Sequence, residues 1–162
     1  MKPENKTYVQ LLVDSTKRKE LLLQKILDYT TDQSRLLKEK VLDYEAFEEI
    51  MNHKAKIIEE IIEIDQGFDT VYKRVETALE QERERFKDEI IIMQKRITSI
   101  TKLGVSIQAL EKKNSTAFQL YLSNEKNKIR EKRASSETAS NYYKNMNHVS
   151  SATVSRFIDE KN

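Results

Sequence analysis

The sequence predicts an all-α protein: an elongated antiparallel helical bundle or coiled coil with one long C-terminal helix and a disordered tail. The 162 residues include only two glycines and one proline, whereas sheets and α/β folds need many more residues that favour turns. Charged residues make up 35% of the chain and aromatic residues 7%, which is typical of helical bundles. Apolar residues also recur at steps of three and four positions, which places them on one face of a helix.

A first helix is expected over about residues 7–39. Residues 14–20 within it are polar on nearly every side, so we expect that turn of the helix to be solvated. The apolar face of this helix consists of Tyr8, Leu12, Leu22, Leu23, Ile26, Tyr29, Leu36 and Leu37.

A second helix is expected over about residues 44–65, after Asp43, whose carboxylate can accept hydrogen bonds from the free backbone amides of the first turn. Gly67 is expected to end this helix, and Asp69 to cap a third helix over about residues 69–82. Residues 80–85 are polar on every face and form either an exposed helical stretch or a turn. The apolar stripe of the second helix is broad enough to contact two neighbours and consists of Phe47, Ile50, Met51, Lys54, Ile57, Ile58, Ile61, Ile62 and Ile64.

The longest helix is expected over about residues 86–133. Gly104 lies in its apolar register, where glycine costs about 1 kcal/mol relative to alanine. This glycine indicates either a close helix crossing or a hinge. The register consists of Ile90, Met93, Ile97, Ile100, Gly104, Ile107, Asn114, Phe118 and Tyr121, with Glu111 as its only charge.

Residues 1–133 are therefore expected to form a single helical domain, followed by a flexible tail over residues 134–162. The tail is rich in Ser, Asn and Lys, and its larger apolar side chains are few. Burying them cannot offset the entropy of ordering the segment by itself. We expect the tail to be disordered unless it docks on the bundle, on another copy or on a partner protein.

Composition argues against several classes of protein. The chain has no cysteine, which excludes disulfide frameworks and thiol catalysis. Its longest apolar run, residues 90–93, is far shorter than the roughly 20 residues of a membrane span. The first residues lack the apolar core of a secretory signal, so we expect a cytoplasmic protein. A net charge of +2 gives no electrostatic reason to expect nucleic acid.

The chain offers little catalytic chemistry. His53 follows Glu49 by one helical turn, but a di-iron bundle needs two Glu-x-x-His pairs and further carboxylates. His148 lies in the tail, and two glycines cannot build a phosphate-binding loop. We therefore predict no catalytic, cofactor-binding or metal-ligating residues and expect the protein not to be an enzyme.

A basic cluster lies at the end of the longest predicted helix. Positive charge there complements the helix dipole, and the alternative is a basic surface that attracts an acidic partner. The cluster consists of Lys126, Lys128, Arg130, Lys132 and Arg133.

Several segments resemble the FlgN-type flagellar export chaperones. They are residues 103–114 (LGVSIQALEKKN), 141–146 (NYYKNM) and 157–162 (FIDEKN). Residues 43–65, which begin DYEAFEEI, are similar to the second helix of that family. As a helical layout, the resemblance covers most of the chain.

The resemblance implies a cytoplasmic, ATP-independent chaperone. Such a protein binds an amphipathic helix of the hook–filament junction proteins, prevents their premature assembly and delivers them to the flagellar type III export machinery. The partners would be these proteins, with no nucleic acid and no membrane span, and a homo-oligomer stays open. Carried over by residue, the resemblance implies a partner-binding site of Leu103, Ile107, Leu110, Asn114, Phe118 and Tyr121 on the long helix, and Tyr142, Tyr143, Met146, Phe157 and Ile158 in the tail.

The periodicity itself fits a second interpretation. The same apolar register would form an ordinary bundle core or a homodimer seam, so the alternative is a self-assembling structural or scaffolding coiled-coil protein. A groove for a foreign helix needs an apolar face that the protein does not cover itself. The chaperone prediction therefore depends on how far the face over residues 103–121 and the tail stay accessible.

Overall fold

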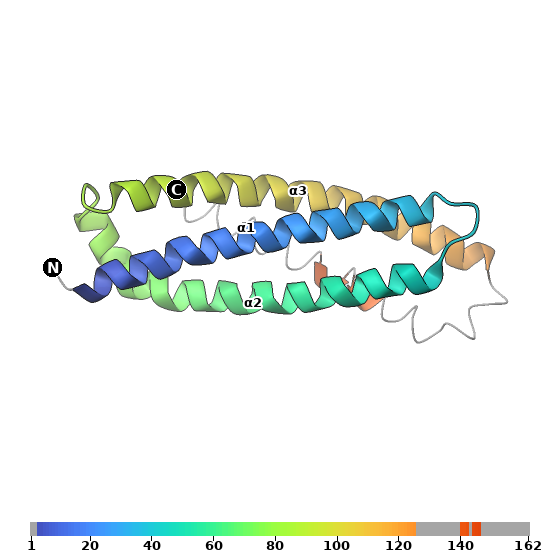
Figure 1. Ribbon diagram of the computed structural model, residues 1–162, viewed down its shortest axis with the longest axis horizontal. Coiled ribbons are helices and arrows are strands. Elements are labelled where there is room, and N and C mark those ends of the chain that lie inside the picture. The colour runs from blue at the N-terminus through green and yellow to red at the C-terminus, as the bar shows by residue number, and fades with distance from the viewer. Residues whose placement is uncertain (1–2, 126–139, 143, 147–162) are drawn as a thin grey trace.

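The computed structural model describes residues 3–125, 140–142 and 144–146. It contains three long helices, α1 (Pro3–Leu37), α2 (Tyr44–Gln81) and α3 (Lys87–Asn124). They run up, down and up along one axis and form an elongated bundle (Figure 1). No strand occurs among the residues described, so the prediction of an all-α antiparallel bundle is confirmed.

Helix α1 begins earlier than the predicted start near residue 7. Pro3 is its first residue, a position that proline favours because its fixed φ suits the helix and the missing N–H would have had no helical partner. After Leu37 the chain makes two tighter bonds, from Lys38 N to Arg35 O at 3.1 Å and from Glu39 N to Leu36 O at 3.3 Å. These bonds close the last turn.

The expectation that residues 14–20 are solvated is wrong for two of them. Thr16 and Lys19 are both buried. The Thr16 hydroxyl donates to Val13 O at 2.7 Å, and Lys19 Nζ lies 2.5 Å from Asp65 Oδ1 on α2. A polar residue on a helix can therefore lie in the interface when a neighbouring helix supplies its partner.

Helix α2 replaces the two helices predicted over residues 44–65 and 69–82. Asp43 Oδ1 accepts a hydrogen bond from Ala46 N at 3.1 Å, which confirms the N-cap. Gly67 does not end the helix, and Asp69 lies inside it rather than capping a new one. The chain buries Ile61 and Phe68 on either side of the glycine, and each contributes more than the roughly 1 kcal/mol by which glycine disfavours a helix.

The polar segment 80–85 contributes the turn between α2 and α3. Glu82 N donates to Ala78 O at 2.8 Å, and Phe86 N donates to Glu82 O at 3.3 Å. Phe86, at the start of α3, is buried against the end of α2. Of the two conformations left open by the sequence, the turn is the one observed.

Helix α3 ends at Asn124, not near residue 133. Glu125 N donates to the carbonyls of Tyr121 and Leu122, which closes the last turn. Residues 126–133, with the basic cluster, lie outside the described residues. The helix passes through buried Gly104 without a break, so the hinge interpretation is wrong and the close-packing interpretation is favoured.

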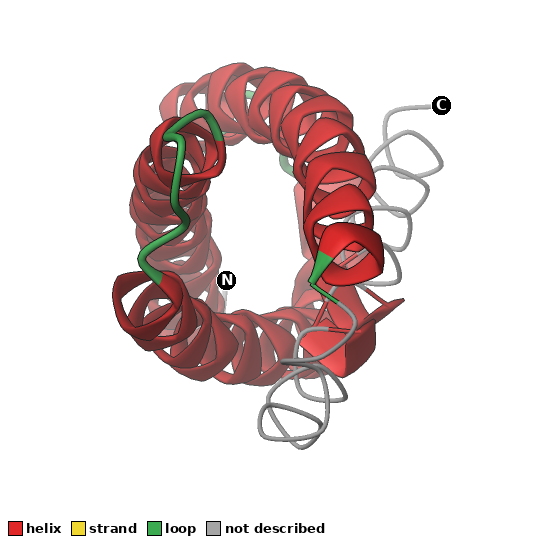
Figure 2. Cartoon of the chain, turned by 90° about the vertical axis from the view of Figure 1, so that its right-hand side faces the viewer, coloured by secondary structure: helices red, strands yellow, loops and turns green. Residues whose placement is uncertain are grey.

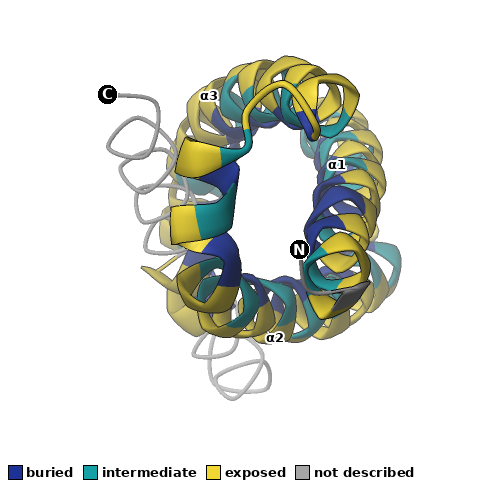
Figure 3. Ribbon diagram, turned by 90° about the vertical axis from the view of Figure 1, so that its left-hand side faces the viewer, coloured by how far each residue is buried: buried dark blue, intermediate teal, exposed yellow. Residues whose placement is uncertain are grey.

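Helix α1 packs along both other helices, whereas α2 and α3 contact each other mainly through side chains near their ends. Seen along the bundle, the three helices surround a common interior (Figure 2). Buried residues face inward and exposed residues outward (Figure 3). The side of the bundle opposite α1, between α2 and α3, is therefore the place where a further helix can pack.

Candidate functional site

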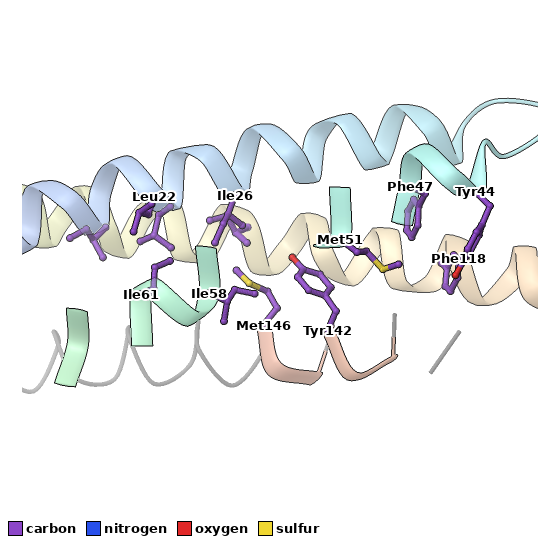
Figure 4. Packing of buried hydrophobic residues seen from close by; sticks show 13 residues of the cluster. Leu22, Ile26, Tyr44, Phe47, Met51, Ile58, Ile61, Phe118, Tyr142 and Met146 are labelled. Carbon is purple, nitrogen blue, oxygen red and sulfur yellow. The ribbon is translucent and has the colours of Figure 1, made fainter. Parts of the chain in front are cut away.

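Part of the tail packs on the bundle between α2 and α3. Residues 140–142 and 144–146 are helical, and the side chains of Tyr142 and Met146 are buried. Both belong to the larger apolar cluster, in which Met146 lies beside Ile58 and Tyr142 lies toward Met51 of α2 (Figure 4). The sequence predicts a disordered tail unless it docks, and this short segment docks on the bundle.

Tyr142 reaches a buried polar cluster that connects all the helical segments. Its hydroxyl donates to Glu111 Oε1 on α3 at 2.7 Å. The hydroxyl of Thr30 on α1 donates to the same oxygen at 3.0 Å. Lys54 Nζ on α2 donates to Glu111 Oε1 as well, and to Gln33 Oε1 on α1 at 2.6 Å. We call Thr30, Gln33, Lys54, Glu111 and Tyr142 the Glu111 cluster.

The charges of this cluster are almost completely removed from solvent. The exposed fractions of the Lys54 and Glu111 side chains are 0% and 1%. Burial lowers the pKa of Lys54 to about 8, against the charge of Glu111 and their hydrogen bond, which raise it. The ammonium group also lies 4.3 Å from the ring centroid of Tyr142, a cation–π distance. Desolvation costs several kcal/mol for each of the two charges, so either charge buried without the other would destabilise the fold.

The two carboxylate oxygens of Glu111 differ in their hydrogen bonding. Within the described residues, Glu111 Oε2 has no hydrogen-bond partner, although it is buried. Its sister oxygen Oε1 accepts from three donors. The cluster is therefore asymmetric, and its contacts with α1, α2 and the docked segment all converge on one atom.

The predicted partner-binding residues of α3 lie in different environments. Ile107, Asn114 and Phe118 are buried in the core of the bundle. Asn114 Nδ2 donates to Thr30 O at 3.0 Å, and the Phe118 ring stacks on Phe47 with 5.0 Å between centroids. The face over residues 103–121 is therefore only partly accessible, because α1, α2 and the docked segment cover these three residues.

The other predicted partner-binding residues are divided between partly accessible positions and undescribed ones. Leu103, Leu110 and Tyr121 are half-buried. Tyr142 and Met146 are buried in the docked segment. Tyr143, Phe157 and Ile158 lie outside the described residues. The structure thus brings Ile107, Asn114, Phe118, Tyr142 and Met146 into one continuous core region.

Sequence reasoning did not predict the pairing of Lys54 with Glu111. The available signal was that each is a charged residue inside an otherwise apolar helical stripe. Such a residue needs a buried partner, since an unpaired buried charge is strongly unfavourable. The identity of the partner depends on how the helices pack, and the pair is separated by 57 residues.

An open groove lies between α2 and α3, toward the turn that joins them. Its volume is about 310 Å³. The rim carries Glu76, Glu80, Arg83 and Gln94. We call this feature the α2–α3 groove, and its apolar lining consists of Phe68, Tyr72, Leu79, Ile90, Met93 and Ile97. In this lining the side chains of Phe68, Leu79 and Met93 are buried, and those of Tyr72, Ile90 and Ile97 are half-buried.

A second depression, between α1 and α2, is lined largely by charged and aromatic side chains. The rings of Tyr29 and His53 stack there with 5.6 Å between centroids, and His53 Nε2 lies 3.8 Å from Glu49 Oε1. Its walls are completed by Lys25, Asp28 and Asp32 of α1 and by Lys56 and Ile57 of α2, and its volume is about 430 Å³. Across the part of the chain that is described, no three His, Asp or Glu side chains gather as ligands of a metal ion would.

Comparisons with known proteins add no family to this geometry. The sequence matches no protein-family model, no curated protein and no solved structure at a significant level. None of the described helices combines the length and the apolar character that crossing a membrane requires. The resemblance to FlgN-type chaperones therefore stays a prediction from the sequence, to be weighed against the docked segment and the α2–α3 groove.

Proposed function

We propose that this protein is a cytoplasmic flagellar export chaperone of the FlgN type. It would bind an amphipathic helix of the hook–filament junction proteins, prevent their premature assembly and deliver them to the type III export machinery. The observation that supports this proposal is the fourth side of the bundle, which the described residues cover only in part. A short tail segment covers part of the space between α2 and α3, and the α2–α3 groove continues beyond it.

The lining of the groove suits an amphipathic helix. Phe68 and Tyr72 lie one turn apart on α2 and stack on each other with 6.0 Å between centroids. Met93 and Ile97 lie one turn apart on α3. A client helix with apolar residues at steps of three and four could place them between these two pairs, as helices do in hydrophobic grooves. Its apolar face would then be kept from self-association.

The resemblance assigns further partner contacts to the docked segment and the face beneath it. Tyr142 and Met146 cover this face. A longer client helix would need to displace the segment, and it would then meet Ile107 and the Glu111 cluster. In this proposal Asn114 and Phe118 are positioning residues, since they hold α3 against Thr30 and Phe47.

The self-assembling alternative receives less support. A homodimer seam needs a continuous apolar stripe on the outer surface. Apart from the adjacent pair Ile91 and Ile92, the exposed large apolar residues of the described helices are scattered. On α3, for example, Lys112 and Thr116 lie between Val105 and Leu120 on the same face. Single apolar residues of this kind are normal on protein surfaces.

Binding of a purified hook–filament junction protein to the full chain tests the proposal. We expect a stable complex in gel filtration, with the affinity reduced at least tenfold by Ile97→Lys, which places a charge in the groove. Thr98→Lys is the matched control, because Thr98 is exposed on another face of α3, and it should bind as the unmodified chain does. Circular dichroism of both variants verifies the fold. No complex with the unmodified chain, or equal affinity of the two variants, would count against the proposal.

A further inference from the structure

We propose that the chain's own C-terminal residues after Met146, with Phe157 and Ile158 as anchors, occupy the α2–α3 groove and complete a four-helix bundle. These residues lie outside the described part of the chain. The inference rests on three properties that the described residues and the sequence supply: the direction of the docked segment, the length of chain that follows it and the spacing of its apolar residues.

The direction of the docked segment points into the groove. Tyr142 meets Lys54 of α2 and Glu111 of α3. Met146, one turn later, lies beside Ile58, which is one turn further along α2 (Figure 4). The segment therefore runs parallel to α2 and antiparallel to α3. A helical continuation leads toward the region where the apolar side chains of α2 and α3 line the groove.

The length of the remaining chain matches the distance to the groove. Phe157 follows Met146 by eleven positions, which is about 16 Å along a helix. On α2, ten positions separate Ile58 from Phe68, the first groove residue on that helix. Because neighbouring helices rise equally per residue, Phe157 would arrive at the level of Phe68. On antiparallel α3 the corresponding position is near Ile97.

The composition of the remaining chain fits a helix that is apolar on one side. Met146, Val149, Thr153 and Phe157 follow one another at steps of three, four and four, so they share a face. Val154 and Ile158 widen that face. The α2–α3 groove offers aromatic and aliphatic side chains to it, and burying Phe157 and Ile158 there would be favourable.

We assign the groove to a segment of the same chain because the residues just before that segment are already docked on the bundle. Tyr142 and Met146 are buried against α1, α2 and α3, so the following residues begin beside the groove. Tethering of this kind gives an effective concentration in the millimolar range, far above that of a second copy at micromolar protein. A second copy in the groove is therefore an outcome of the test and not part of the proposal.

Docking of residues 147–162 in the groove does not depend on the proposed function. The effect of this docking on client binding does rest on the proposed function. If the groove receives a client helix, residues 147–162 would compete with that helix for the same surface. The affinity for the client would then rise when Phe157 and Ile158 are removed. The docking itself can be measured with no client present, so the two proposals can fail separately.

Cysteine cross-linking tests the docking directly, because the chain has no cysteine of its own. The full chain carrying Phe157→Cys and Ile97→Cys is oxidised at low micromolar concentration. We expect a disulfide within one chain, seen as a monomer that loses both free thiols. The matched control pairs Phe157→Cys with Thr98→Cys on another face of α3 and should form at least tenfold less of it. Equal yields of the two pairs, or cross-links found only between chains, would overturn the proposal.

A fluorescence measurement covers the case in which the cysteines disturb packing. The chain has no tryptophan, so Phe157→Trp introduces a single reporter. We expect blue-shifted emission from a buried indole, which moves to the red when Ile97→Lys is added and stays blue with Thr98→Lys. Emission typical of a solvent-exposed indole in all three proteins would equally contradict docking.

Discussion

Lys54 of α2 and Glu111 of α3 form an ion pair that is sealed from solvent on every side. The two residues are 57 positions apart in the sequence, and their side chains are 0% and 1% exposed. The pair connects the two helices that otherwise pack mainly on α1. It also receives the hydroxyl of Tyr142 from the tail. The same pair therefore contributes to bundle geometry and to docking of the C-terminal segment.

Removing one partner of this pair is expected to destabilise the bundle strongly. Glu111→Leu leaves Lys54 buried without its counter-charge, which typically costs about 3–5 kcal/mol. The double variant Lys54→Met with Glu111→Leu should recover most of that loss, because apolar replacements of buried pairs are often neutral. Urea unfolding followed by circular dichroism measures these differences.

Lys113→Leu is the control for these variants, since Lys113 is exposed on α3. It should change the free energy of unfolding by no more than about 0.5 kcal/mol. A Glu111→Leu variant as stable as this control would show that the pair is not the stabilising contact that its burial indicates.

The stability of the protein should rise with pH above pH 8 through Lys54. Burial lowers the pKa of Lys54 from 10.5 to about 8, so between these values the unfolded chain binds a proton that the folded chain has released. Stability increases with pH wherever the unfolded state binds more protons. The gain should approach about 3 kcal/mol near pH 10.5, at 1.36 kcal/mol per pH unit.

The double variant Lys54→Met with Glu111→Leu isolates this contribution, because the other titrating groups remain. Subtracting its unfolding free energy from that of the unmodified chain at each pH should give a flat difference below about pH 8. The difference should favour the unmodified chain increasingly above that pH. A difference that stays flat up to pH 10.5 would contradict a lowered pKa for Lys54.

The Asp43 cap and the turn near residues 82–86 show what local sequence patterns can predict. Both depend on a few adjacent residues and on hydrogen bonds within one turn of backbone. The continuity of α2 through Gly67 is different. The local preference against glycine is about 1 kcal/mol, and it is outweighed by the burial of Ile61 and Phe68, which depends on packing against other helices.

The candidate site could be predicted only in part for a related reason. Periodicity identified Ile107 and Phe118 as members of an apolar face, but it does not specify what covers a face. Lys54 and Glu111 were visible as charges in apolar stripes, and their pairing became visible only with the helices in place. The position of the docked segment could not be predicted for both reasons. Tyr142 covers the apolar face, and it is held by a cluster built from three distant parts of the chain.

Gly67→Ala is expected to stabilise the protein by about 1 kcal/mol. Gly67 is exposed in the interior of α2, and an added Cβ would meet no atom within 4 Å. Alanine is therefore accommodated without strain, while it lowers the entropy of the unfolded chain. A thermal melt should show a higher midpoint. A lower midpoint would mean that the backbone at residue 67 is not the regular helix described.

Tyr142→Phe is expected to weaken docking of the tail segment while leaving the bundle folded. The substitution keeps the apolar ring and removes the hydroxyl that donates to Glu111 Oε1 at 2.7 Å. A hydrogen bond to a charged group contributes about 1.5–3 kcal/mol, so amide exchange in residues 140–146 should accelerate roughly 10- to 100-fold. Mass spectrometry of peptic peptides measures this rate, with α1 peptides as the internal reference.

Lys144→Ala removes an exposed side chain of the same segment and should leave the rate unchanged. Equal protection in Tyr142→Phe and the unmodified chain would mean that the apolar contacts of Met146 and the Tyr142 ring hold the segment without the hydroxyl.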